Sequence, residues 1–173
     1  MCTYQFYYIN FVITILCYHI MSNQITLLNN YYLQYYIIGI VNERIRLILI
    51  DTGAAMSFIK QSFVHQESLT PIQPYTVKGY LDHHTIGDKY LVEHSTNINV
   101  ILSNTFNKTL LLKTTQTKAD VLGAEVLFGM DFLDSFESYS ITKEQLILRE
   151  GAITHYIPRI TVDTETIRET LNY

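Results

Sequence analysis

The chain has 173 residues, 48% of them apolar, which is enough for one hydrophobic core of ordinary size plus appendages. Its 12 Lys and Arg are spread thinly against 16 Asp and Glu, so the chain lacks the basic runs that bind nucleic acid. Cys2 and Cys17 both precede the sheet-forming part of the chain, which excludes a disulfide framework there. The six histidines have no zinc-ligand spacing, and the pair His83 and His84 is interpreted as part of a polar loop, so no metal or cofactor is expected.

The first 42 residues differ in composition from the rest, because they contain no Asp, Glu, Lys or Arg and more than half of the 14 tyrosines. The apolar run at residues 6–20 lacks the positive flank and cleavage site of a signal peptide. Asn10 and His19 interrupt this run and no Lys or Arg flanks it, which disfavours a membrane span. We therefore interpret residues 1–29 as an apolar N-terminal extension, either disordered or a product of upstream sequence, with a membrane-anchored form as the disfavoured alternative.

From about residue 31 onward, short apolar segments alternate with turn signals. The segments that predict strands are residues 36–41, 44–50, 55–59, 75–77, 90–92, 98–102, 109–112, 126–128, 140–142 and 145–148. We also expect a hairpin turn at residues 42–43, a helical turn within residues 62–68, breaks at Pro71 and Pro74, and one short helix at residues 130–136. Strands this short and frequent predict a small, closed all-β barrel at residues 30–150. Residues 151–173 are polar and are predicted to be a linker or tail.

The most informative motif is the tripeptide of Asp51, Thr52 and Gly53, which lies between two apolar runs. Asp-x-Gly also occurs in ordinary exposed turns, but the apolar flanks favour a carboxylate at the end of a buried strand. A lone carboxylate is costly to ionise there. Two carboxylates within about 3 Å share one proton. Such a pair can deprotonate a water molecule and protonate the amide being cleaved, which is the chemistry of peptide hydrolysis.

The chain has one Asp-Thr-Gly, so the second carboxylate must come from elsewhere. The simplest source is Asp51 of a second copy across a two-fold axis. Gly53 allows a sharp turn and brings its amide near the carboxylate. Thr52 can place its hydroxyl against the backbone of the partner, and Ala54 is small enough to leave a path for the substrate. The sequence therefore predicts that the motif is half of a dimeric active site.

Residues 49–59 (LIDTGAAMSFI) and residues 126–133 (VLFGMDFL) together resemble the retropepsin-like aspartic proteases of retroviruses, LTR retrotransposons and plant pararetroviruses. The first segment is similar to the apolar-Asp-Thr-Gly-Ala site of that family, and the second to its strand-Gly-helix signature. Their order and separation also match. Residues 136–148 resemble the hairpin that follows in retrotransposon and caulimovirus-type members, and the resemblance covers about residues 31–150.

The resemblance implies a homodimeric aspartic endopeptidase that cleaves its own viral or retrotransposon polyprotein in the host cytoplasm or the virus particle. It implies that each subunit supplies one catalytic tripeptide, here Asp51, Thr52 and Gly53. A hairpin flap at about residues 78–86 is implied to close over the substrate. The implied substrate-binding residues are Ala54, Ala55, Gly79, Tyr80, Leu127 and Gly129.

The chain departs from many retroviral members at two positions. Where they have an Asp two residues after the Gly and an Arg after the later Gly, this chain has Ala55 and Met130. An ionic tie at the base of the dimer is therefore not expected, which predicts weak dimerisation. A catalytically silent retropepsin-like dimerisation or binding module is the main alternative. A cellular shuttle-type protein is a further alternative, which is disfavoured because such proteins carry additional binding domains.

Overall fold

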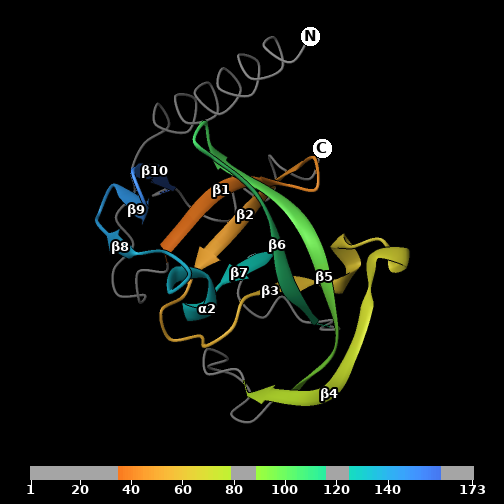
Figure 1. The fold of residues 1–173 in the computed structure, drawn as a ribbon. Coiled ribbons are helices and arrows are strands. Elements are labelled where there is room, and N and C mark those ends of the chain that lie inside the picture. Colours follow the sequence, from red (N-terminus) through yellow and green to blue (C-terminus); the bar gives the residue numbers. More distant parts are fainter. Residues whose placement is uncertain (1–34, 79–88, 116–124, 161–173) are drawn as a thin grey trace, which may run out of the picture. The chain divides into compact units, whose positions relative to one another are not determined.

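The computed structural model describes residues 35–78, 89–115 and 125–160, which all belong to one compact unit, Gln34–Ile160. Over these residues the structure has one ten-stranded sheet, one short helix, and two consecutive 3-10 turns between the third and fourth strands (Figure 1). The elements in chain order are β1 (Tyr35–Val41), β2 (Arg44–Ile50), β3 (Phe58–Lys60), η1 (Gln61–Phe63), η2 (Gln66–Ser68), β4 (Thr70–Lys78), β5 (Lys89–Ser103), β6 (Phe106–Thr115), β7 (Val126–Phe128), α2 (Met130–Leu133), β8 (Ser138–Ile141), β9 (Gln145–Glu150) and β10 (Ile153–Ile160).

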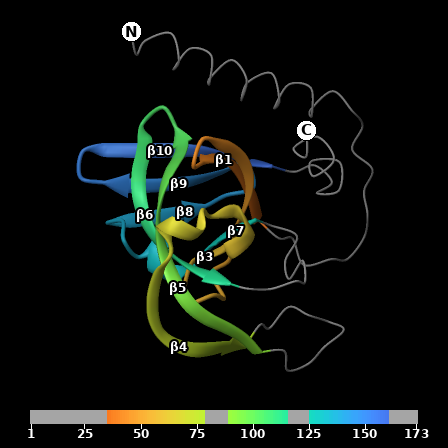
Figure 2. The same ribbon diagram turned by 90° about the vertical axis from the view of Figure 1, so that its right-hand side faces the viewer.

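Six strands close into a barrel in the order β5, β6, β3, β7, β2, β1, because β1 pairs with β2 and also with β5. β4 continues the sheet beyond β5, and β10, β9 and β8 continue it from β1 (Figure 2). Two pairings are parallel, β2 with β7 and β3 with β6. The expected all-β barrel with one short helix is confirmed.

The first hairpin forms where the sequence predicts it. Asn42 and Glu43 have φ angles of 46° and 66°, the left-handed conformation that a two-residue turn between twisted strands requires. Asn42 also donates its N–H to the carbonyl oxygen of Asn99 and accepts the Asn99 N–H at its side-chain oxygen, both at 3.0 Å. These bonds attach the turn to β5, next to the pairing of β1 with β5 that closes the barrel.

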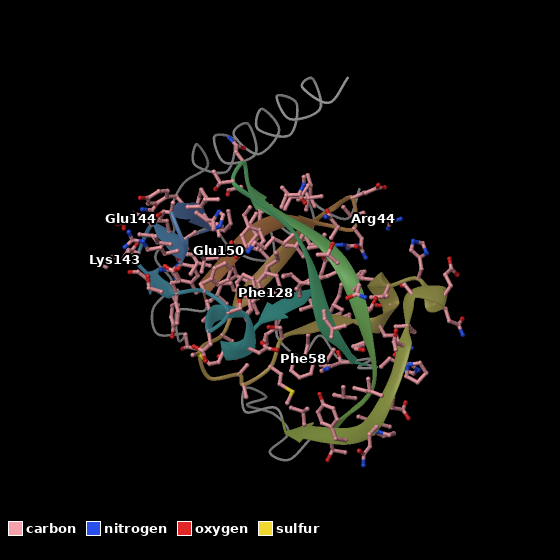
Figure 3. All side chains as sticks on the ribbon, viewed as in Figure 1. Arg44, Phe58, Phe128, Lys143, Glu144 and Glu150 are labelled. Carbon is pink, nitrogen blue, oxygen red and sulfur yellow. The ribbon has the colours of Figure 1, made fainter. Side chains whose placement is uncertain are left out.

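An aromatic cluster fills the barrel where β7 leads into α2. Phe128 stacks on Phe132 with ring centroids 4.1 Å apart, and Phe106 and Phe136 pack around Phe132 at 6.1 and 5.2 Å. Figure 3 shows Phe128 among the enclosed side chains, whereas Arg44 lies at the periphery. Rings in these tilted and stacked arrangements stabilise a core beyond the area that they bury. The cluster therefore holds the end of β7 and the start of α2 rigidly in place.

Three strands differ from the predicted ones. The strand expected at residues 55–59 is only Phe58–Lys60, because the carbonyl groups of Ala54 and Ala55 bond to the start of α2 instead of a neighbouring strand. Residues 90–92 and 98–102 belong to one continuous strand, β5, whose polar middle section pairs with β6. The expected breaks at Pro71 and Pro74 lie inside β4, where proline is tolerated because this is an edge strand with a register shift.

The tail predicted from residue 151 is wrong for residues 153–160, which form β10 between β1 and β9. The period-two pattern is hard to recognise because its first buried member is a histidine. His155 is 1% exposed; its Nδ1 lies 2.9 Å from the Thr105 hydroxyl, and its ring packs edge-on against Phe106 at 5.2 Å. Pro158 lies just outside the short pairing of β10 with β1, where its missing N–H removes no bond.

Candidate active site

The turn that carries Asp51 starts where β2 ends, beside the last residue of β7. Ile50 pairs in parallel with Phe128, and the Asp51 N–H donates to the Phe128 carbonyl oxygen at 3.0 Å. The Ala54 N–H then donates to the Asp51 carbonyl oxygen at 3.1 Å, which closes a tight turn. Because β2 is buried over Leu47–Ile50 and β7 is buried throughout, the turn projects from a rigid base.

The Asp51 carboxylate is half-buried and is oriented by the turn itself. Its Oδ1 accepts the Gly53 N–H at 2.8 Å. A side chain at position 53 would place its Cβ 3.1 Å from that same oxygen, so glycine leaves the carboxylate unobstructed. Thr52 and Gly53 are exposed, and Asp51 is partly exposed. The predicted approach of the Gly53 amide to the carboxylate is confirmed, and the tripeptide lies at a surface where another molecule can approach.

Gly129 brings the α2 segment against the Asp51 loop, which comprises residues 51–57 between β2 and β3. The N–H groups of Met130 and Asp131 donate to the carbonyl oxygens of Ala54 and Ala55 at 2.8 and 3.3 Å. A Cβ at position 129 would lie 2.6 to 2.7 Å from backbone oxygens of this loop, which only glycine avoids. The two motifs quoted from the sequence are therefore in direct contact, 75 positions apart along the chain.

A buried hydrogen-bond chain between these segments was missed in the sequence analysis. Ser57 is 1% exposed; its hydroxyl accepts the Gly129 N–H at 2.9 Å and donates to Asp131 Oδ1 at 2.5 Å. The same oxygen accepts the Phe132 N–H at 2.8 Å. Ser57 lies between Met56 and Phe58, and a serine in such an apolar run is a signal that a buried partner exists. Nothing in the sequence indicates that this partner is Asp131.

We expect Ser57→Ala to lower the free energy of unfolding by about 2 kcal/mol, because it leaves the buried Gly129 N–H without an acceptor. Urea unfolding of the full chain measures the change. Ser62→Ala, at an exposed position in η1, is the matched control and should change stability by less than about 0.5 kcal/mol. Equal effects of the two substitutions would contradict the role given to Ser57.

Of the other predicted site residues, two lie in or next to the Asp51 loop and two lie outside the described residues. Leu127 is 8% exposed and pairs with Leu49 in parallel and with Phe58 antiparallel, directly beneath the Asp51 loop. Ala55 is exposed, and its carbonyl oxygen bonds to the α2 backbone. Gly79 and Tyr80, with the rest of the expected flap, His83 and His84, lie outside the described residues, as do residues 1–29.

Tyr75, in β4, adds a contact to the loop that the sequence does not predict. Its hydroxyl donates to Met56 Sδ at 3.3 Å. Burial raises the pKa of this hydroxyl, and the negative charge of Asp131 raises it further. The hydroxyl therefore remains a donor at neutral pH, and β4 is connected to the loop that follows Asp51.

Metal ligands and membrane spans can be assessed for the described residues alone. In these ranges, no group of three His, Cys, Asp or Glu side chains is arranged to hold a metal ion. Among the helical segments that the structure describes, none is long and apolar enough to span a bilayer.

Three comparisons with known proteins place the chain among viral relatives and a known fold. No family model matches the sequence. Uncharacterized protein 7 of soybean chlorotic mottle virus is 32% identical over 120 residues, which cover 69% of this chain and 74% of that protein. The putative polyprotein CP of cassava vein mosaic virus is 30% identical over 158 residues, covering 82% of this chain but only 11% of the polyprotein.

One solved structure shows the same fold. The retroviral protease-like domain of Ddi1 from Leishmania major has a TM-score of 0.52 at 12% identity, covering 75% of this chain and 96% of that domain. A retropepsin-like aspartic protease from Rickettsia conorii has a TM-score of 0.43 at 20% identity, covering 72% and 84%. The chain therefore belongs to the same family as uncharacterized protein 7 of soybean chlorotic mottle virus, and its fold is that of the retropepsin-like aspartic proteases.

Proposed function

We propose that the chain is an aspartic endopeptidase that cleaves a viral polyprotein, with an active site formed by Asp51 from each of two copies. The observation that carries this proposal is the Asp51 carboxylate, which the Gly53 amide orients on an exposed turn at the end of a buried strand. The putative polyprotein relative supports the proposed class of substrate. Thr52, Gly53 and the small Ala54 complete the proposed site, with Ala55, Gly79, Tyr80, Leu127 and Gly129 beside the substrate.

In the proposed reaction, the two Asp51 carboxyl groups share one proton and hold a water molecule between them. The charged carboxylate removes a proton from the water as its oxygen attacks the peptide carbonyl carbon. The other carboxyl group gives its proton to the amide nitrogen, the C–N bond breaks, and the pair again holds one proton. A single copy cannot do this, because it supplies one carboxyl group.

Two kinetic measurements on the full chain test the proposal. We expect a bell-shaped dependence of peptide cleavage on pH with a mildly acidic optimum, because the pair must be singly protonated. A rate that is flat from about pH 4 to 8 would contradict the shared-proton mechanism.

Specific activity should also rise with protein concentration and then level off. The positions of Ala55 and Met130 carry no charge, so an ionic tie between subunits is not expected there. Activity that is constant over a wide dilution series would contradict a weak dimer. A chain that dimerises but cleaves neither peptides nor viral polyprotein would instead be the silent module.

A further inference from the structure

Met56 and Tyr75 form a contact that the proposed reaction does not use. Met56 lies in the Asp51 loop, is 39% exposed, and accepts the Tyr75 hydroxyl at its sulfur at 3.3 Å. Tyr75 belongs to β4, which at this point pairs only with β5 and has no neighbour on its other side in the described sheet. The thioether therefore provides a side-chain link between an edge strand and the Asp51 loop.

The backbone of Met56 is fixed while its side chain is accessible. Its carbonyl oxygen lies 2.6 Å from the position that a Cβ on Gly129 would take, so the loop is packed tightly against the start of α2. Met130 is the useful comparison. The Tyr139 hydroxyl approaches its sulfur only to 3.9 Å, and the side chain packs against the hydrophobic core.

We propose that Met56 is an oxidation site, and that its conversion to the sulfoxide opens the contact with Tyr75 and loosens β4 from the Asp51 loop. The oxidant is a peroxide. With hydrogen peroxide, the sulfur attacks one oxygen, a sulfur–oxygen bond forms and the O–O bond breaks, and the departing hydroxide takes the proton of the sulfur-bound hydroxyl and leaves as water. The sulfur loses two electrons and the peroxide gains them.

The geometry explains why this change matters. In the sulfoxide, the new oxygen is bonded to the sulfur and projects from it. A hydroxyl that donates to this oxygen must lie at hydrogen-bond distance from the oxygen, and therefore farther from the sulfur. At the present separation of 3.3 Å, the new oxygen does not fit between the two groups. The hydroxyl and the sulfur must therefore separate, and β4 is the element that can move, since the Met56 backbone is held against Gly129.

The first test does not depend on catalysis. The full chain is treated with dilute hydrogen peroxide, sulfoxides are located by peptide mass spectrometry, and amide hydrogen exchange is measured in residues 70–78. We expect Met56 to oxidise before Met130 and exchange in β4 to become about fivefold faster, the loss that one hydrogen bond predicts. In Met56→Leu, the treatment should leave this exchange unchanged. Oxidation of Met130 ahead of Met56, or unchanged exchange in the Met56 sulfoxide, would overturn the proposal.

The second test rests on the proposed function, because it measures cleavage before and after oxidation. Each protein is compared with its own untreated sample, and we expect kcat/KM to fall about fivefold in wild type and in Met130→Leu but not in Met56→Leu. Methionine sulfoxide reductase should restore the wild-type rate. Equal inactivation of Met56→Leu would overturn the oxidative effect on activity. An untreated chain without any cleavage would overturn the proposed function, while the exchange measurement would still decide the role of Met56.

Discussion

Asp51→Asn is expected to lower kcat for peptide cleavage by about 10³-fold, within the range for removal of a general acid or base. Asparagine has nearly the same shape as aspartate, and its side-chain oxygen can still accept the Gly53 N–H. It cannot remove a proton from water or share one with a partner. We therefore expect the loss in kcat to occur without loss of fold, as measured by steady-state kinetics together with thermal unfolding.

The matched control is Asp134→Asn, which makes the same chemical change at an exposed position after α2. Its activity should equal that of wild type. Cleavage by Asp51→Asn at more than about a tenth of the wild-type rate would reject the assignment of Asp51.

Mixing the two proteins tests whether each dimer needs two copies of Asp51. With equal amounts of wild type and Asp51→Asn at saturating concentration, random exchange places half of the wild-type subunits in inactive mixed dimers. Activity should therefore fall to about half that of the same amount of wild type alone. Activity that stays level, or rises up to about 1.5-fold because mixed dimers are as active as wild type, would show that one copy of Asp51 is sufficient.

Gly129→Ala is expected to lower the free energy of unfolding by about 3 kcal/mol. The new Cβ would lie 2.6 Å from the Met56 carbonyl oxygen and 2.7 Å from that of Ala54. Both are backbone atoms of a loop that is hydrogen-bonded to α2, so neither can move without breaking those bonds. Gly129 has φ −96°, so the effect comes from lack of space and not from a strained backbone.

Gly151→Ala is the control for this substitution. At Gly151 the added Cβ has room, so only the cost of the left-handed backbone conformation is measured, whereas Gly129→Ala measures the cost of a steric clash. Gly151 has φ 57°, and no atom lies within 4 Å of the position that a Cβ would take, so alanine there should destabilise the chain by only about 1 kcal/mol. Urea unfolding of both variants gives the comparison.

If Gly129→Ala also loses most of its cleavage activity while still folded, the contact between α2 and the Asp51 loop positions the turn that carries Asp51. A loss of stability no larger than that of Gly151→Ala would contradict the packing argument.

Several elements follow from local signals in the sequence. The hairpin at Asn42 and Glu43, the strand at Val126–Phe128 and the hairpin of β8 and β9 form where they were predicted. In each case, an apolar segment ends at residues that favour a turn, so the signal and the structure concern the same few residues. The turn at Asp51 belongs to this group, because a glycine two residues after the carboxylate is enough to bring an amide to it.

Other features depend on contacts between distant residues. Residues 153–160 were predicted as part of a tail because residues 151–173 are polar and weakly periodic, yet Thr105 and the ring of Phe106 make a buried position for His155 favourable. The shortening of β3 arises because the backbone before it bonds to α2 instead.

By itself, the sequence determined that Asp51 ends an apolar strand, that Gly53 turns the chain there, and that one copy supplies one carboxyl group. The tertiary structure decided that Ser57, in the Asp51 loop, bonds to Gly129 and Asp131 at the start of α2, and that Tyr75 contacts Met56. The physical reason is that a turn depends on the conformations of adjacent residues, whereas a hydrogen bond across 74 positions exists only after the barrel has closed.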